Sequence, residues 1–151
     1  DGELGELVFT SLTKQGLPMV RYRTRDLTRL LPGTARPAFR RMEKVTGRSD
    51  DMIILRGVNV FPTQLEELVL RTAGFSPHFQ LILGRAGRLD TLSVRVEARS
   101  DCPPERRAPA AEALAREVKD RVGVTVLVEV VDPETLERSA GKLQRVIDRR
   151  S

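Results

Sequence analysis

The pattern of hydrophobic and polar positions in this 151-residue chain changes about a third of the way along. In the first third, short apolar stretches at 6–10, 18–22, 27–31 and 40–45 are separated by glycine, proline and charged residues. Short runs bounded by turn residues predict strands. A piece this small has too few apolar positions to bury a core of its own. We therefore expect residues 1–49 to be the last strands of a larger N-terminal domain.

The rest of the chain has a regular pattern. Strands are predicted at 52–55, 58–61, 79–83, 91–98 and 125–131, and helices at 62–74 and 105–122. Proline suits the first turn of a helix, and Thr63 with Glu66 predicts a capping box there. The order β-α-β-β-α-β, followed by a polar tail, predicts an α+β fold. We expect a small sheet of three to four strands flanked by two helices.

The charge of the chain is concentrated at one end. The sequence pI is about 10.1, yet the whole excess of five positive charges lies in residues 1–49, and residues 50–151 are neutral. A local basic cluster attracts phosphates of any kind, which leaves a nucleic-acid-binding module as one alternative. Aromatic residues make up only 4% of the chain, so stacking platforms for bases are scarce and we do not expect a nucleic-acid partner.

A second alternative is a regulatory, ferredoxin-like domain that binds a small ligand or forms a dimer, because the predicted element order permits that fold as well. Cys102 is the single cysteine, which excludes an internal disulfide and a cysteine metal cluster. No apolar run approaches the roughly 20 residues that span a bilayer. The chain opens without a methionine or a signal peptide, so we expect a piece of a longer cytoplasmic protein with no membrane partner and no metal site.

Three motifs carry candidate chemistry. Residues 47–57 place an arginine and two acids directly before a short apolar strand that ends at a glycine. Residues 22–26 end in an aspartate, and ionised carboxylates accept hydrogen bonds from diols. Residues 139–146 place a lysine directly after a glycine. A lysine on such a loop can reach forward as a point charge toward phosphate.

In this order, the three motifs resemble the hinge and C-terminal domain of adenylate-forming acyl-CoA ligases, and most closely the phenylacetate–CoA ligase branch. The resemblance implies that Lys142 bridges the acid substrate and the α-phosphate of ATP during adenylation. It implies that Asp26 holds the ribose of ATP. The wider superfamily usually has glycine before this aspartate, whereas Arg25 stands here, as in the phenylacetate branch. Arg48 is expected to contact ribose or phosphate.

The same resemblance divides the chain into two parts. Residues 1–49 would end the N-terminal, nucleotide-binding domain, and residues 50–151 would form a mobile C-terminal lid. Asp50 is then the hinge on which the lid turns. Arg56 and Gly57 would head a hairpin that lines the tunnel for the pantetheine arm of CoA, since glycine permits close backbone approach.

For the intact enzyme, the resemblance implies the conversion of phenylacetate, ATP and CoA to phenylacetyl-CoA, AMP and pyrophosphate, with Mg²⁺ accompanying ATP. The phosphate-binding loop and the aromatic acid pocket of the family lie upstream of the matching region. We therefore expect the chain alone to bind none of these molecules and to be inactive without its N-terminal domain. The exposed strand edge in residues 1–31 could pair two copies, so a homodimer stays open.

Overall fold

The computed structural model of the protein describes residues 2–137 and 145–150. The chain divides into two compact units, Asp1–Met52 and Ile53–Ser151. The sequence predicted a division between residues 49 and 50, and the roles assigned to the two parts remain proposals.

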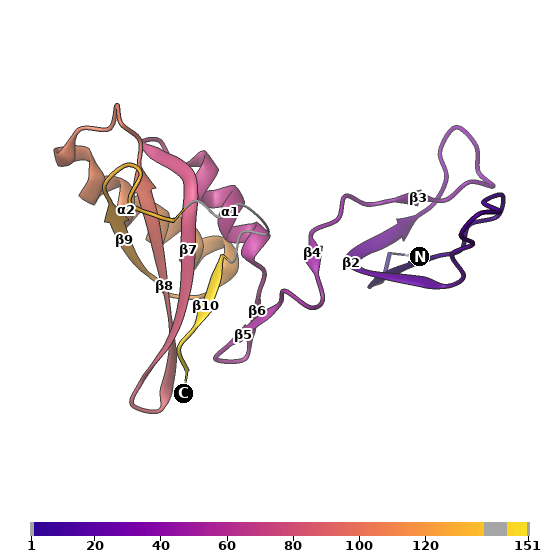
Figure 1. Ribbon diagram of the computed structural model, residues 1–151, viewed down its shortest axis with the longest axis horizontal. Coiled ribbons are helices and arrows are strands. Elements are labelled where there is room, and N and C mark those ends of the chain that lie inside the picture. The colour runs from indigo at the N-terminus through magenta and orange to yellow at the C-terminus, as the bar shows by residue number, and fades with distance from the viewer. Residues whose placement is uncertain (1, 138–144, 151) are drawn as a thin grey trace. The chain divides into compact units, whose positions relative to one another are not determined.

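The first unit is a small antiparallel sheet. Strand β2 (Tyr22–Leu31) pairs with β1 (Leu4–Phe9), β3 (Arg41–Met42) and β4 (Gly47–Arg48) (Figure 1). The prediction of separate strands at 18–22 and 27–31 is wrong. Residues 18–21 lie outside any strand, and the polar residues 23–26 join 27–31 in the single strand β2.

This unit buries almost nothing by itself. Among its described residues only Thr28 and Gly47 are buried. Large apolar side chains are exposed instead, and the most exposed are Leu12, Leu17, Val20 and Phe39. This unit therefore has no buried apolar core among its described residues, as its small number of apolar positions led us to expect.

The second unit has the predicted α+β architecture. A hairpin of β5 (Ile53–Leu55) and β6 (Val58–Val60) leads into α1 (Pro62–Arg71). A four-stranded sheet follows, with the order β10-β7-β8-β9. The strands of this sheet are β7 (Phe75–Ala86), β8 (Leu89–Ala98), β9 (Leu127–Val131) and β10 (Val146–Asp148). The second helix, α2 (Pro104–Val122), lies between β8 and β9 in the sequence.

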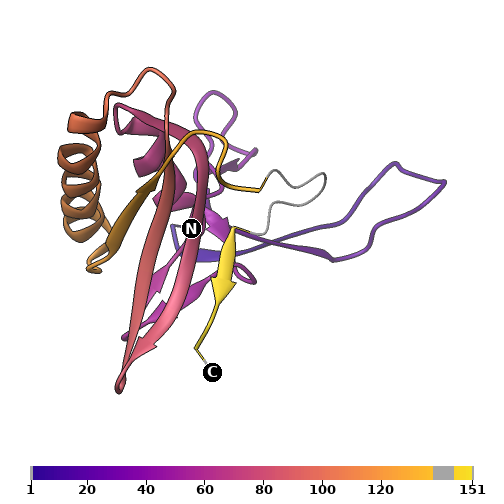
Figure 2. The ribbon, with the colours of Figure 1, turned by 60° about the vertical axis from the view of Figure 1, so that its left-hand side comes forward.

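Both helices cover the same side of this sheet (Figures 1 and 2). Helix α1 packs on β7, α2 packs on β9, and the helices contact each other. Buried residues recur with period two in the strands and with helical spacing in α1 and α2. The core between the layers is formed by Leu65, Leu68, Val69, Phe79, Leu81, Leu83, Leu92, Val94, Val96, Leu114 and Val118. Neither helix in the described ranges is long and apolar enough to cross a membrane.

Two local expectations fail in this unit. The capping box of Thr63 and Glu66 is wrong, because α1 begins with Pro62 and its N-cap is Phe61. The side chain of Gln64 instead accepts the Phe61 amide hydrogen at 3.1 Å. The tail after β9 was expected to be polar and without strands, yet β10 returns to the sheet and runs parallel to β7.

Candidate functional site

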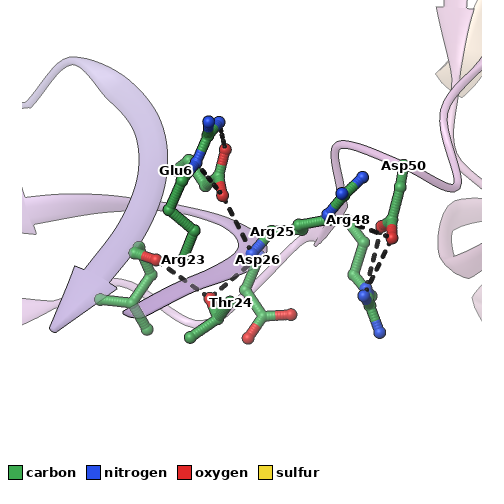
Figure 3. Close-up of polar contacts among 8 residues, drawn as sticks. Glu6, Arg23, Thr24, Arg25, Asp26, Arg48 and Asp50 are labelled. Atoms are coloured by element: carbon green, nitrogen blue, oxygen red, sulfur yellow. Dashed lines mark hydrogen bonds and ion pairs between the residues drawn. The ribbon is translucent and has the colours of Figure 1, made fainter. Parts of the chain in front are cut away.

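Asp26 lies inside β2, opposite Arg48 of β4 in the antiparallel ladder (Figure 3). Asp26, which lies between the strands predicted at 18–22 and 27–31, is therefore a strand residue. The register between β1 and β2 shifts between Glu6 and Val8, and Arg25 has a positive φ of 65°. A bulge of this kind re-aims the neighbouring side chains.

The carboxylate of Asp26 is half-buried. The amide hydrogen of Asp26 is donated to the Thr24 hydroxyl at 3.1 Å, which fixes the backbone at the bulge. Within the described residues, the carboxylate itself makes no hydrogen bond or ion pair, and Figure 3 draws no dashed line to it. Because an ionised carboxylate can only accept hydrogen bonds, this group is available to a ligand hydroxyl.

Arg48 and Asp50 form a two-point ion pair. Nε of Arg48 lies 3.0 Å from Oδ1 of Asp50, and Nη2 lies 3.0 Å from Oδ2. Nε of Arg25 approaches the same carboxylate at 3.8 Å. Withdrawal from water, the largest single influence, raises the pKa of Asp50, but the hydrogen bonds from Arg48 and from the Asp50 backbone lower the pKa below its ordinary value. The predicted hinge aspartate is therefore ionised at neutral pH and held by two arginines.

Glu6 supports the bulge from β1. Its carboxylate accepts a hydrogen bond from Nε of Arg23 at 3.0 Å and from the amide of Arg25 at 3.2 Å. The side-chain hydrogen bond from Arg23 lowers the pKa of Glu6. The sequence analysis missed Glu6 and Arg23. The unusual arginine before Asp26 is the signal that the backbone there needs support, because a non-glycine residue at positive φ is uncommon.

Arg56 and Gly57 form the turn between β5 and β6. Leu55 pairs with Val58 across the hairpin, and the two turn residues have φ angles of 50° and 80°. Two successive positive φ angles are the signature of a type I′ turn. The Arg56 guanidinium is exposed and donates a long hydrogen bond of 3.5 Å to the Thr125 carbonyl.

The predicted lysine, Lys142, lies outside the described residues. The described residues on either side of it are anchored to unit two. The amide of Leu136 donates a 2.6 Å hydrogen bond to the buried carboxylate of Glu97. On the other side, Arg145 pairs with Glu66 of α1 and stacks over Phe79, 5.1 Å from the ring centre.

No group of three or more His, Cys, Asp or Glu side chains gathers anywhere in residues 2–137 or 145–150. Cys102 is buried and is a free cysteine. The candidate residues therefore form two separate groups. Asp26, Arg48 and Asp50 belong to the first unit, and the Arg56–Gly57 turn belongs to the second.

Comparison with known proteins connects these features. Phenylacetate-coenzyme A ligases of Escherichia coli (strain K12) and Pseudomonas putida are 52% and 54% identical to the chain. The alignments cover 100% and 99% of the chain, which spans only 35% of either relative's length.

A solved structure of 2-hydroxyisobutyryl-CoA ligase in the postadenylation state, in complex with R3-HIB-AMP, matches with a TM-score of 0.82 and 27% identity over 97% of this chain and 32% of that one. The same ligase in the thioesterification state, in complex with 2-HIB-AMP and CoA, matches with a TM-score of 0.63 and 28% identity over 99% of this chain and 32% of that one. The AMP-binding enzyme C-terminal domain family matches residues 57–150. Because this match covers more than half of the sequence, the chain belongs to the AMP-binding enzyme C-terminal domain family.

Proposed function

We propose that the chain is the C-terminal part of an AMP-forming phenylacetate–CoA ligase, and that it supplies the adenylation lysine and the hinge. The observation that carries this proposal is the identity of 52–54% to two such ligases along essentially the whole chain. The family match favours the ligase over the nucleic-acid-binding and ferredoxin-like alternatives. The cytoplasmic location expected from the sequence is part of the same proposal.

In the first half-reaction, a carboxylate oxygen of the aryl acid attacks the α-phosphorus of ATP, and pyrophosphate leaves. Asp26 accepts hydrogen bonds from the ribose hydroxyls, which the open carboxylate at the bulge supports. Arg48 lies opposite Asp26 in the ladder and is positioned to contact ribose or phosphate with the N–H groups that Asp50 does not use. Lys142 stabilises the charge that develops between acid and phosphate. Mg²⁺ enters with ATP as part of the substrate.

The hinge proposal draws on the two states of the neighbouring ligase. A rigid segment would match both states equally well. The TM-score instead falls from 0.82 to 0.63 at nearly constant coverage, which supports a change of conformation in the part of that ligase equivalent to this chain. In the present chain, Asp50 would be the pivot of such a change, because a few residues between compact units absorb the dihedral rotation.

In the second half-reaction, the CoA sulfur attacks the acyl carbon of the adenylate. The carbon–sulfur bond forms, AMP leaves with the electron pair of the acyl–oxygen bond, and the thiol proton passes to solvent. The turn of Arg56 and Gly57 would line the path of the pantetheine arm. Its support is geometric, since the turn is exposed and its glycine presents backbone without a side chain.

The test is the substitution Lys142→Ala in the full-length ligase. Acid-dependent exchange of pyrophosphate into ATP should fall by about 10²–10³, the typical value of one such charge-stabilising donor. Conversion of supplied phenylacetyl-adenylate and CoA to thioester should be retained. Lys119→Ala, an exposed lysine on α2, is the matched control and should leave both steps unchanged. Equal loss of both half-reactions in the Lys142 variant would contradict the assigned role.

A further inference from the structure

The side chain of Arg150 forms hydrogen bonds with three segments of the second unit. Its Nη2 donates to Oδ2 of Asp148 at 2.7 Å. Its Nη1 lies 3.1 Å from Oδ2 of Asp90, at the start of β8, and 3.2 Å from the backbone carbonyl oxygen of Ile54 in β5. Only 23% of the Arg150 side chain is exposed. The C-terminal end of β10 is thereby tied to the β7–β8 hairpin and to the β5–β6 hairpin.

The carboxylates around Arg150 are already balanced in charge. Asp90 is held from the other side by Nε of Arg85 at 3.0 Å, and the hydrogen bonds from Arg85 and then Arg150 lower the pKa of Asp90. Two guanidinium groups thus face two carboxylates. A network that is neutral and internally satisfied is suited to fixing backbone geometry and not to capturing a charged ligand.

The β5–β6 hairpin needs a directional contact to fix its orientation in the second unit. It forms a two-stranded sheet separate from the four-stranded one, so strand pairing does not set its position in the unit. The side chains of Ile53, Leu55 and Val60 are buried in the core, and hydrophobic burial is non-directional. The hydrogen bond from Arg150 to the Ile54 carbonyl adds a directional contact one residue before the end of β5.

We propose that Arg150 is a positioning residue for thioester formation: through the Ile54 carbonyl, it holds the β5–β6 hairpin in the orientation that brings the Arg56–Gly57 turn to CoA. This rests on the proposed function of that turn. The role requires the planar fork of arginine, because one guanidinium serves Asp148, Asp90 and the carbonyl together. A lysine ammonium is a compact charge on a flexible stem and cannot reproduce that fixed geometry.

Arg145 offers a contrast at the other end of β10. It contacts Glu66 and Phe79 and has no described contact with the hairpin. Loss of Arg150 leaves these contacts and the three β10–β7 pairs, Val146↔Leu81, Ile147↔Ile82 and Asp148↔Leu83, in place. The segment that carries Lys142 therefore keeps its attachment to the unit, and adenylation should survive when the hairpin loosens.

The experiment measures both half-reactions in the full-length ligase with Arg150→Gln, Arg150→Lys and, as control, Arg121→Gln, which removes an ion pair on the exposed face of α2. For both Arg150 variants, we expect pyrophosphate exchange within about twofold of the parent. Thioester formation from supplied phenylacetyl-adenylate should fall about tenfold or more, with a raised KM for CoA, since small misplacements of a positioning group cost this much. The control should change neither step.

Equal loss of both steps, or full activity of Arg150→Lys, would overturn the role of Arg150. If Arg150→Gln does not fold, the charge-retaining Arg150→Lys decides the matter alone, with its thermal unfolding measured alongside. Failure of the proposed function has a different signature: the unsubstituted ligase itself would then produce no acyl-CoA from phenylacetate, ATP and CoA.

Discussion

Gly74, between α1 and β7, offers a sharp test of how the second unit is packed. It has a φ of 94°, and a Cβ built on it would lie 2.8 Å from the sulfur of Cys102. Cys102 itself is buried two positions before the start of α2. The substitution Gly74→Ala therefore imposes two separate penalties, one on the backbone conformation and one on the contact with the sulfur.

The two penalties have different magnitudes and can be separated. A side chain at a left-handed backbone position costs about 1–2 kcal/mol, and an extra methyl group forced into a packed site costs about 1–3 kcal/mol. We expect Gly74→Ala to lower the free energy of unfolding by about 2–5 kcal/mol. Gly123→Ala is the matched control, because Gly123 has a φ of 83° and nothing within 4 Å of its built Cβ. It should show the backbone penalty alone.

The assay is urea unfolding of the chain followed by circular dichroism at 222 nm, since both described helices belong to the second unit. In a Cys102→Ala background the sulfur is absent, and Gly74→Ala should then cost only about as much as Gly123→Ala. The difference between backgrounds is the interaction energy of a double-mutant cycle. If Gly74→Ala costs the same with and without the sulfur, the proposed contact does not limit this position.

Two further predictions concern the turn and the C-terminal network. Arg56→Asn should raise the free energy of unfolding by about 0.5–1 kcal/mol, because asparagine suits the first position of a type I′ turn better than arginine. The same substitution should lower the rate of thioester formation. A lower free energy of unfolding in urea would argue against the turn geometry. The hydrogen bond from the Arg150 side chain, with that from its backbone, lowers the pKa of Asp148 to about 2. A depressed folded-state pKa stabilises the protein above the unfolded value near 3.8 and loses that stabilisation as the pH falls toward 2. Thermal unfolding between pH 5 and pH 2.5 should therefore show a smaller decline for Asp148→Asn than for the parent, and parallel curves would refute the assignment.

Much of the second unit could be predicted from local sequence. Pro62 predicted the start of α1, the apolar spacing in residues 105–122 predicted α2, and Gly123 ends that helix with a φ of 83°. These signals are local, because helical periodicity and a left-handed stop need no distant partner. Strand β10 escaped prediction because its three residues are stabilised by pairing with β7, more than sixty positions earlier in the chain.

The residue types at the candidate site, and their order, were set by the sequence alone: an aspartate after Arg25, an arginine and an acid before an apolar strand, and a glycine at a hairpin turn. Tertiary structure decided which of them meet. The ladder between β2 and β4 places Asp26 opposite Arg48. Asp50 pairs with Arg48, two positions before it, and with Arg25, 25 positions before it. The hydrogen bond from the Arg150 side chain to the Ile54 carbonyl joins positions that are 96 residues apart. Local pattern cannot encode such contacts, because ion pairs and carbonyl hydrogen bonds depend on where folding brings the backbone.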